Sequence, residues 1–274
     1  MTPIPIDDAD DPRIAPYRAV RDRDLRERSE VGSGHGGRFI AEGEVVLDAL
    51  LRRSRYRPDS LLIAEARLAG LAPLLQAAPE GVPVYTAGRG VMDAIVGFPI
   101  HRGVLGVGLR GAPPAVSDVL GGEGPVLVGI GIANHDNVGG LFRNAAAFGA
   151  ASVLLDAASA DPLYRKAIRV SAGAALSLPH ARGEAHALID ALEAAGRGPF
   201  ALTPRGDLAL AQLAATPRCA LVVGAEGPGL PDDILARLPG VRIAMAPEAV
   251  AAGFDSINVA TAAAIALHHV MRNG

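Results

Sequence analysis

The chain of 274 residues is half hydrophobic, which allows one large or two ordinary domains with a substantial core. Its formal net charge of -3 and its lack of tryptophan argue against nucleic-acid binding through a basic overall field or a platform of stacked aromatic rings, so a nucleic-acid partner needs a local patch. The single cysteine, Cys219, excludes an intramolecular disulfide and a thiolate metal cluster, and we expect it to pack at a strand start.

The N-terminal stretch MTPIPIDDADDPR is polar and acidic, and no apolar run reaches the roughly 18 residues of a membrane span. We therefore expect a cytoplasmic protein that does not enter a membrane. The segment DPRIAPYRAVRDRDLRERSE has charges that alternate in sign, which favours a solvated helix face over an RNA-binding arm. His35, in the glycine-rich loop after it, has no carboxylate or second histidine nearby and is predicted to be a loop residue rather than a ligand.

Residues 1–112 are predicted to form a small α/β domain, because short apolar runs alternate with amphipathic stretches. The expected elements are a helix over 42–53, a strand over 60–65, a helix over 69–77, a strand over 82–86, a short helix over 90–96 and a strand over 103–109. The stretch that follows is dense in Gly and Pro and lacks an apolar period, which predicts a linker over 113–124.

Arginines gather at the end of the helix predicted over 42–53. Cations at this place complement the helix dipole, so a purely structural reason exists for them. A group this dense is also suited to binding phosphate. Together with one arginine of the preceding stretch, the residues predicted to bind RNA are Arg38, Arg52, Arg53, Arg55 and Arg57.

Residues 125–274 are predicted to form a second α/β domain, in which strands and helices alternate as in a parallel sheet. Strands are expected over 126–132, 152–156, 176–181, 199–203, 219–227 and 241–245, and helices from about Val138, Tyr164, Ala185, Asp232 and Asn258. The sequence contains no repeat with a period of about 20 to 50 residues.

The stretch NHDNVGGLFRNAAAFGA, residues 134–150, follows the first of these strands and is the first of three with chemical character. It begins with residues that cap helices, and its glycines allow close backbone approach. A strand end that leads into a helix start is where open α/β sheets bind their ligands. A helix from about Val138 turns Leu141 inward and leaves Arg143 and Asn144 near the open strand ends. The alternative is a surface arginine on an ordinary amphipathic helix.

The second stretch, LVVGAEGPGLP, is a buried strand that runs into a turn with three glycines, residues 224, 227 and 229. Such a turn leaves backbone N–H groups and space for a ligand. It is not a dinucleotide fingerprint, because the GxGxxG spacing fails, and it is not a phosphate loop, because GK[ST] is absent. Glu226 inside the turn can orient a ligand hydroxyl or pair with a cation such as Arg143, and the alternative is a solvent-exposed loop acid.

The third stretch, MAPEAVAAGFDSINVATAAAIALHHV, brings Asp255, Ser256 and Asn258 to the start of a long alanine-rich helix. Asp255 or Ser256 can simply cap that helix. His268 and His269, far along the helix, are expected to be packing or surface residues.

Taken together, the three stretches resemble the motifs of the SpoU (TrmH-like) branch of the SPOUT methyltransferases. The motifs read NVGGLFRNAAAFGA, VVGAEGPGL and DSINVATAAAIAL here, in this order and each at a strand end. The stretches GRFIAEGEVVLDALL and GFPIHRGVLGVG are similar to the substrate-binding domain that often precedes this domain in the family. One departure is the loop IAMAPEAVAAGFDS before the third motif, which is several residues longer than in the family.

The resemblance implies a parallel-sheet SPOUT domain with a deep trefoil knot, a homodimer formed through this domain, and S-adenosylmethionine as the cofactor. It implies transfer of a methyl group to a ribose 2′-hydroxyl of ribosomal or transfer RNA, without a metal ion. The residues it places around the cofactor are Val223, Gly224, Ala225, Gly227, Gly229, Leu230, Ile243, Met245, Ile257 and Val259. The residues it places at the reaction are Asn137, Arg143, Glu226, Ser256 and Asn258.

The resemblance assigns the proton-handling role to Arg143. A guanidinium keeps its proton in proteins, so the alternative is that Arg143 binds the target phosphate and orients the hydroxyl. Two other functions stay open from the sequence: a nicotinamide-dependent Rossmann enzyme, which would lack the usual fingerprint, and a noncatalytic RNA-binding protein. All four polar motif residues are present, which disfavours a degraded site: Arg143, Glu226, Ser256 and Asn258.

Overall fold

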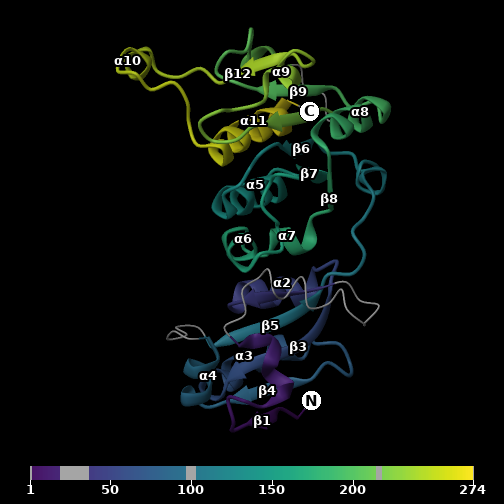
Figure 1. The fold of residues 1–274 in the computed structure, drawn as a ribbon, viewed down its shortest axis with the longest axis vertical. Helices are drawn as coiled ribbons and strands as arrows, with labels where there is room; N and C mark the ends of the chain where they lie inside the picture. Colours follow the sequence, from purple (N-terminus) through teal and green to yellow (C-terminus); the bar gives the residue numbers. More distant parts are fainter. Residues whose placement is uncertain (1, 19–36, 97–102, 214–217, 274) are drawn as a thin grey trace. The chain divides into compact units, whose positions relative to one another are not determined.

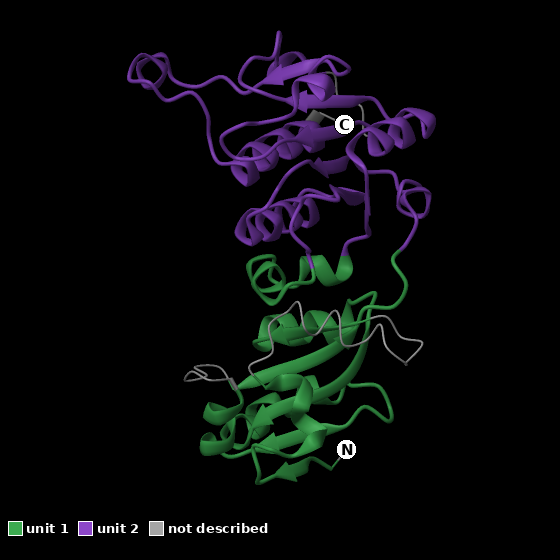
Figure 2. Cartoon of the chain, in the orientation of Figure 1, with its two compact units in different colours: residues 1–113, 163–177 green, residues 114–162, 178–274 purple. Residues whose placement is uncertain are grey.

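The structure is a computed structural model that describes residues 2–18, 37–96, 103–213 and 218–273. Most of the mixed-charge segment, His35 with its glycine-rich loop, and residues 97–102 of the stretch GFPIHRG lie outside the described residues. The chain divides into two compact units (Figure 2): unit 1 contains residues 1–113 and 163–177, and unit 2 contains 114–162 and 178–274.

Unit 1 is built on a five-stranded sheet of order β1-β4-β3-β5-β2 (Figure 1). β3 is parallel to β4 and antiparallel to β5. The strands are β1 (Ile4–Ile6), β2 (Arg38–Glu42), β3 (Arg57–Ala64), β4 (Val84–Ala87) and β5 (Val104–Leu109). The helices are η1 (Pro12–Tyr17), α2 (Glu44–Arg52), η2 (Glu65–Arg67), α3 (Leu68–Leu75) and α4 (Arg89–Val96). The predicted α/β character is confirmed, and the sequence analysis missed both edge strands, β1 and β2.

Both faces of this sheet are covered, as the alternation of side chains along β3 shows. Leu61 and Ile63 pack with α2 and α3, whereas Leu62 packs with η1 and α4 on the other face. The Tyr17 hydroxyl is hydrogen-bonded to Ser60 Oγ at 2.8 Å, which ties η1 to its face of the sheet. Burial raises the pKa of Tyr17, so this hydroxyl stays neutral at physiological pH.

The segment 163–177 completes the core of unit 1, although it comes from the middle of the predicted second domain. It contains α6 (Arg165–Val170) and α7 (Ala174–Ser177). Leu163, Ile168 and Leu176 belong to the same buried cluster as the apolar face of α2. Gly173 has a φ of +83°, and a Cβ there would clash with Ala49 on α2, so only glycine allows this close approach.

Unit 2 is built on a seven-stranded, wholly parallel sheet of order β10-β12-β9-β11-β6-β7-β8. The strands are β6 (Val126–Gly129), β7 (Ser152–Asp156), β8 (His180–Gly183), β9 (Pro199–Leu202), β10 (Leu208–Ala209), β11 (Ala220–Val223) and β12 (Gly240–Arg242). The helices are η3 (Val116–Val119), α5 (His135–Ala147), α8 (Ala185–Ala194), η4 (Leu210–Gln212), α9 (Asp232–Leu235), α10 (Pro247–Ala251) and α11 (Val259–Asn273). The predicted parallel sheet is therefore confirmed.

Several predicted elements differ in their bounds. The strand expected over 176–181 begins only at His180, because Leu176 and Ser177 end α7. The strand expected over 241–245 ends at Arg242. Cys219 lies buried just before β11, as expected, and burial raises the pKa of its thiol to about 11, so it is not a reactive thiolate at neutral pH.

The stretch expected to be a linker, 113–124, is in large part folded into unit 2. Val119 and Leu120 are buried in the core of that unit. The guanidinium of Arg197, whose side chain is 1% exposed, donates to the carbonyl oxygens of Leu120, Gly122 and Gly124. The Gly- and Pro-rich composition therefore reflects a loop held by a buried arginine. The boundary between the units falls at the start of the stretch expected to be a linker, and the rest of that stretch belongs to unit 2.

Candidate active site

The first motif begins with a capped helix start at the carboxyl end of β6. The side chain of Asn134 accepts a hydrogen bond of 2.8 Å from the Asp136 N–H, so α5 begins at His135 rather than near Val138. Asn137 in the first turn is 7% exposed. Arg143, on the same helix, is exposed and has no hydrogen bond or ion pair among the described residues.

The second motif is a turn that folds back on itself after β11. The Gly229 N–H donates to the Ala225 carbonyl oxygen at 3.0 Å, and a Cβ at Gly224 would overlap the backbone of Gly229 and Leu230. Gly227 and Gly229 have φ values of +87° and +75°, which favour glycine, and around both there is open space. The turn therefore exposes its backbone at the edge of the sheet.

The third motif meets the other two at Asn258. Its Oδ1 accepts from the N–H groups of Ala260 at 3.0 Å and Thr261 at 3.2 Å, which caps α11. Its Nδ2 donates to Asn137 Oδ1 at 2.9 Å and to Glu226 Oε1 at 2.7 Å. An amide nitrogen has two hydrogens, and both are used here. One side chain thus joins all three motifs, and we name Asn137, Glu226 and Asn258 the amide junction.

The helices α5 and α11 pack closely beneath this junction. A Cβ at Gly140 would lie 2.8 Å from the Ala260 Cβ, so glycine is needed for the close approach. The Asn144 side chain donates to the Ala260 carbonyl oxygen at 2.7 Å. The sequence analysis placed Asn144 near the open strand ends but did not count it among the site residues, although it lies on the same helix face as Asn137, seven residues earlier.

Two possibilities that the sequence left open for these residues are not realised in the structure. Asn258 caps α11, not Asp255 or Ser256, and the exposed Ser256 hydroxyl donates to Asp255 Oδ1 at 2.9 Å instead of joining the junction. Glu226 is bonded to Asn258, and no ion pair among the described residues joins it to Arg143. The long loop contains the helix α10, which lies away from the sheet of unit 2 (Figure 1).

The family model of the SpoU rRNA Methylase family matches residues 125–268. An uncharacterized tRNA/rRNA methyltransferase from Mycobacterium bovis is 39% identical to this chain over 273 residues, which cover 97% of this chain and 91% of that protein. The chain belongs to the SpoU rRNA methylase family. Its class is therefore that of the RNA methyltransferases, which argues against the nicotinamide-dependent enzyme.

Solved structures share the fold of this SpoU protein. An AdoMet-bound rRNA methyltransferase from Sinorhizobium meliloti has a TM-score of 0.78 at 24% identity, with 98% of this chain and 97% of that chain covered. An RNA 2′-O ribose methyltransferase has a TM-score of 0.74 at 23% identity, with 98% of this chain and 99% of that chain covered. At these identities the likeness concerns the fold alone, and it agrees with the predicted α/β class.

The residues expected around a cofactor lie along the turns of the second and third motifs of this SpoU chain. Val223, Leu230 and Val259 are buried, and Gly224, Ala225, Ile243 and Met245 are half-buried. Gly227, Gly229 and Ile257 are exposed, as is the neighbouring Phe254 at 65%. The second-motif turn offers backbone groups, and the segment before α11 offers the exposed apolar side chains of Phe254 and Ile257.

The arginines expected to bind RNA have unequal surroundings in unit 1. Arg38 pairs with Asp59 at 2.8 Å. Arg52 and Arg53 share one carboxylate, that of Asp48, each at 3.2 Å. The remaining two, Arg55 and Arg57, are exposed and form no ion pair among the described residues. We name these five residues the arginine cluster: Arg38, Arg52, Arg53, Arg55 and Arg57.

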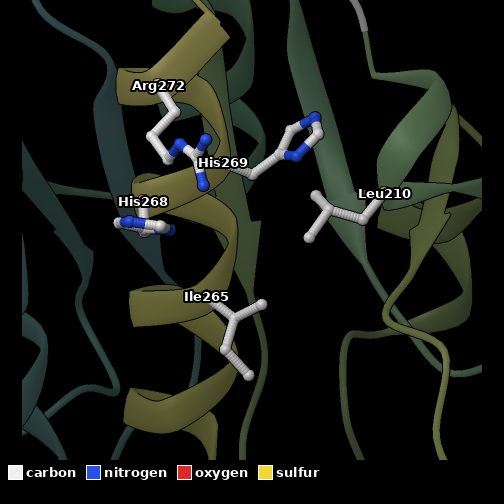
Figure 3. A pocket seen from close by; sticks show the side chains of 5 residues that line it. All are labelled: Leu210, Ile265, His268, His269 and Arg272. Atoms are coloured by element: carbon white, nitrogen blue, oxygen red, sulfur yellow. The ribbon is translucent and has the colours of Figure 1, made fainter.

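A cavity of about 380 Å³ lies on the far part of α11 (Figure 3) and is lined by Leu210, Ile265, His268, His269 and Arg272. Ile265 is seven residues beyond Asn258, or roughly 10 Å along the helix, so this cavity is separate from the amide junction. His268 packs edge-on against Phe148, which agrees with the expected packing role. Within the described ranges no cluster of His, Cys, Asp and Glu suits a metal ion, and no helix combines the length and apolarity of a membrane span.

Proposed function

We propose that this SpoU protein transfers a methyl group from S-adenosylmethionine to a ribose 2′-hydroxyl of ribosomal or transfer RNA. The observation that carries the proposal is the amide junction, in which Asn258 is bonded to Asn137 and Glu226. Three stretches far apart in the sequence meet there through polar side chains at the carboxyl edge of a parallel sheet, where α/β folds bind ligands.

The surroundings of the second motif suit S-adenosylmethionine. The exposed backbone of the turn from Gly224 to Leu230 can bind the polar edge of an adenine, and Gly227 and Gly229 leave open space beside it. The side chains of Ile257 and Phe254, both exposed, can cover the apolar face of the ring. When bound, the cofactor supplies an activated methyl group, because the sulfonium is its leaving group, so the reaction needs no metal ion.

The protein has to align a weak nucleophile with the methyl group and to manage one proton. We propose that Arg143 binds the phosphate beside the target nucleotide and orients the 2′-hydroxyl. Arg143 is exposed and has no carboxylate partner among the described residues, so its guanidinium is available to a phosphate. A guanidinium retains its proton, so the hydroxyl proton leaves to phosphate or water rather than to Arg143.

The other residues of the motifs prepare the site. Asn137 and Glu226 are held in fixed positions by Asn258, which reduces the reorganisation needed when RNA binds. Ser256, exposed on the segment before α11, contacts the bound ligands in this proposal. The arginine cluster of unit 1 binds the RNA backbone, with Arg55 and Arg57 contributing most because they have no ion pair among the described residues.

We further propose that two copies associate through unit 2 and that its C-terminal segments form the trefoil knot of the family. The exposed apolar side chains Ile265 and Met271 on α11, at 39% and 49%, support a contact with a second copy. Sedimentation of the purified protein tests the dimer, because a monomer at micromolar concentration contradicts it.

The central experiment compares ligand binding with RNA modification. Calorimetry should detect binding of S-adenosylmethionine and its demethylated product, and none of NAD or NADP. Mapping of 2′-O-methyl positions in total RNA from cells with and without the protein should then identify the target nucleotide. Binding of RNA without any lost methyl position would favour the noncatalytic RNA-binding protein instead.

A further inference from the structure

A second polar cluster supports the backbone that leads into the first motif. Asp156 closes β7, the strand beside β6, and is 7% exposed. Its Oδ1 accepts from the Gly131 N–H at 3.0 Å, from the Ser159 N–H at 2.9 Å and from the Ser159 hydroxyl at 2.5 Å. Ser159, which is 4% exposed, in turn accepts from the Ile132 N–H at 2.9 Å.

These side chains accept two of the four backbone hydrogen bonds that hold the loop between β6 and α5. Four N–H groups lie between the end of β6 and the cap Asn134, those of residues 130–133. The first continues the sheet by donating to Val223, and the last donates within the loop to Gly131. The two between them, of Gly131 and Ile132, donate to the side chains of Asp156 and Ser159. Buried N–H groups need such partners, so the path of this loop depends on the two side chains.

Arg182 on β8 holds the other side of the cluster. Its guanidinium donates to the carbonyl oxygens of Asp156 and Ala157 at 3.1 Å, of Ser159 at 2.5 Å and of Ala160 at 3.1 Å. The Ala160 N–H also donates to the Ile132 carbonyl oxygen at 2.8 Å. The loop after β7 is therefore fixed from β8 and fixes the loop after β6.

We infer that Asp156 and Ser159, held by Arg182, are positioning residues for methyl transfer. They set the point at which α5 begins, and with it the place of Asn137 and Arg143 at the site. The inference rests on the proposed function for its effect on the reaction, but its structural part can be measured without activity. No hydrogen bond of the described residues joins any of the three to the amide junction, so they act through the loop of residues 130–134.

The test compares four variants of the full-length protein by hydrogen–deuterium exchange, cofactor binding and steady-state kinetics. Asp156→Ala and Ser159→Ala remove acceptors, whereas Asp156→Asn keeps an oxygen for the Gly131 N–H. The matched control is Ser152→Ala, since Ser152 is a buried serine at the opposite end of β7 whose hydroxyl has no partner among the described residues.

Both alanine variants at the cluster should exchange faster at residues 130–134 and lose roughly 10- to 100-fold in kcat, because misplaced reacting groups cost this much. Their affinity for S-adenosylmethionine should stay that of the wild type, since the cofactor is proposed to bind the other two motifs. Asp156→Asn should recover most of the rate, and Ser152→Ala should match the wild type. A general loss of stability would instead lower both binding and rate, and Asp156→Asn would not rescue it selectively.

The outcomes separate the two proposals. If the wild type binds S-adenosylmethionine and methylates RNA but both alanine variants keep the wild-type kcat, the positioning role is wrong. If the wild type transfers no methyl group to any RNA, the proposed function fails, and the exchange of residues 130–134 alone decides whether the cluster holds this loop. Unchanged exchange in both alanine variants overturns the inference in either case. If Asp156→Ala does not fold, Ser159→Ala carries the comparison.

Discussion

The amide junction of unit 2 and the arginine cluster of unit 1 are both dense in polar side chains, but they differ in how those side chains are paired. In the junction, Asn258 uses both of its amide hydrogens and its oxygen within the motifs. In the cluster, Asp48 and Asp59 offset much of the charge of Arg38, Arg52 and Arg53. The junction is therefore a fixed assembly. The cluster is a surface whose net positive charge is smaller than its five arginines would give alone, because Asp48 and Asp59 lie beside three of them.

Replacing Asn258 should give the largest effect in the molecule. Asn258→Ala removes the cap of α11 and both bonds of the junction, so we expect a loss of about 1–2 kcal/mol in the free energy of unfolding. Methyl transfer should fall by at least about 100-fold because Asn137 and Glu226 lose their common partner. Thermal unfolding and methylation of the mapped RNA measure the two losses.

Asn258→Asp is the matched control for this prediction. It keeps an oxygen for the N–H groups of Ala260 and Thr261, but it cannot donate to Asn137 and places a carboxylate beside Glu226. Activity should be lost while most of the capping contribution remains. An active Asn258→Asp enzyme would show that the bonds of the junction are not needed for the reaction.

Substitution of Arg143 tests whether an exposed arginine on α5, the helix that carries Asn137, acts on RNA. Arg143→Ala should abolish methyl transfer and leave unfolding and cofactor affinity unchanged, because Arg143 is exposed and unpaired among the described residues. Arg143→Lys keeps the charge but not the bidentate geometry and should retain a small fraction of the rate. The control is Arg205→Ala, an arginine of the same unit that is 72% exposed and weakly paired at 3.6 Å. Full activity of Arg143→Ala would remove this residue from the mechanism.

The effect of substitutions in the arginine cluster on RNA affinity should depend on whether the replaced arginines are paired with a carboxylate, and not only on how many are replaced. Replacing Arg55 and Arg57 by Ala should weaken binding to all RNA sequences alike and reduce the slope of log affinity against log salt by about 1.5, at roughly 0.7 to 0.9 for each phosphate contact. Replacing Arg52 and Arg53 should change the slope less, and Asp48→Asn should increase RNA affinity by freeing both. Filter binding across a salt series measures all three, and equal slopes for the two double variants would contradict the role of Asp48.

The sequence predicted the parallel sheet and the three motifs because both depend on local signals: short apolar runs, capping residues and glycine turns. It also placed each motif at a strand end, and the carboxyl ends of parallel strands share one edge of a sheet. The hydrogen-bond partners within the site were not predictable from the sequence. Asn258 rather than Ser256 caps α11. Glu226 binds the amide of Asn258 rather than Arg143, a choice that depends on how segments distant in the sequence come together in the folded chain.

Two misassignments have the same physical origin. The composition of residues 113–124 indicates only that this stretch has no regular apolar pattern. The buried Arg197 that holds the stretch in place comes from a loop distant in the sequence. Likewise, the alternation of strands and helices placed residues 163–177 in the second domain, whereas Leu163 and Ile168 complete the core of unit 1. Local patterns report which residues are buried, but not which neighbours bury them.

The smallest effect that we predict concerns a surface pair outside the amide junction and the arginine cluster. It shows how much an exposed hydrogen-bonded ion pair contributes to stability in this protein. His186 Nε2 and Asp233 Oδ2 are 2.7 Å apart, and this hydrogen bond lowers the pKa of Asp233 below its ordinary value. A carboxyl whose pKa is lower in the folded state contributes stability above its unfolded pKa, and this contribution is lost as the pH falls through the folded pKa.

The melting temperature of Asp233→Asn should therefore lie slightly below that of the wild type at pH 6, and the two melting temperatures should converge below about pH 4. His186→Ala should show the same convergence, and the double variant should lose no more than either single variant, since both remove one interaction. Calorimetric scans across this pH range measure the differences, and a gap that stays constant down to pH 3 would show that the pair does not contribute through the charge of Asp233.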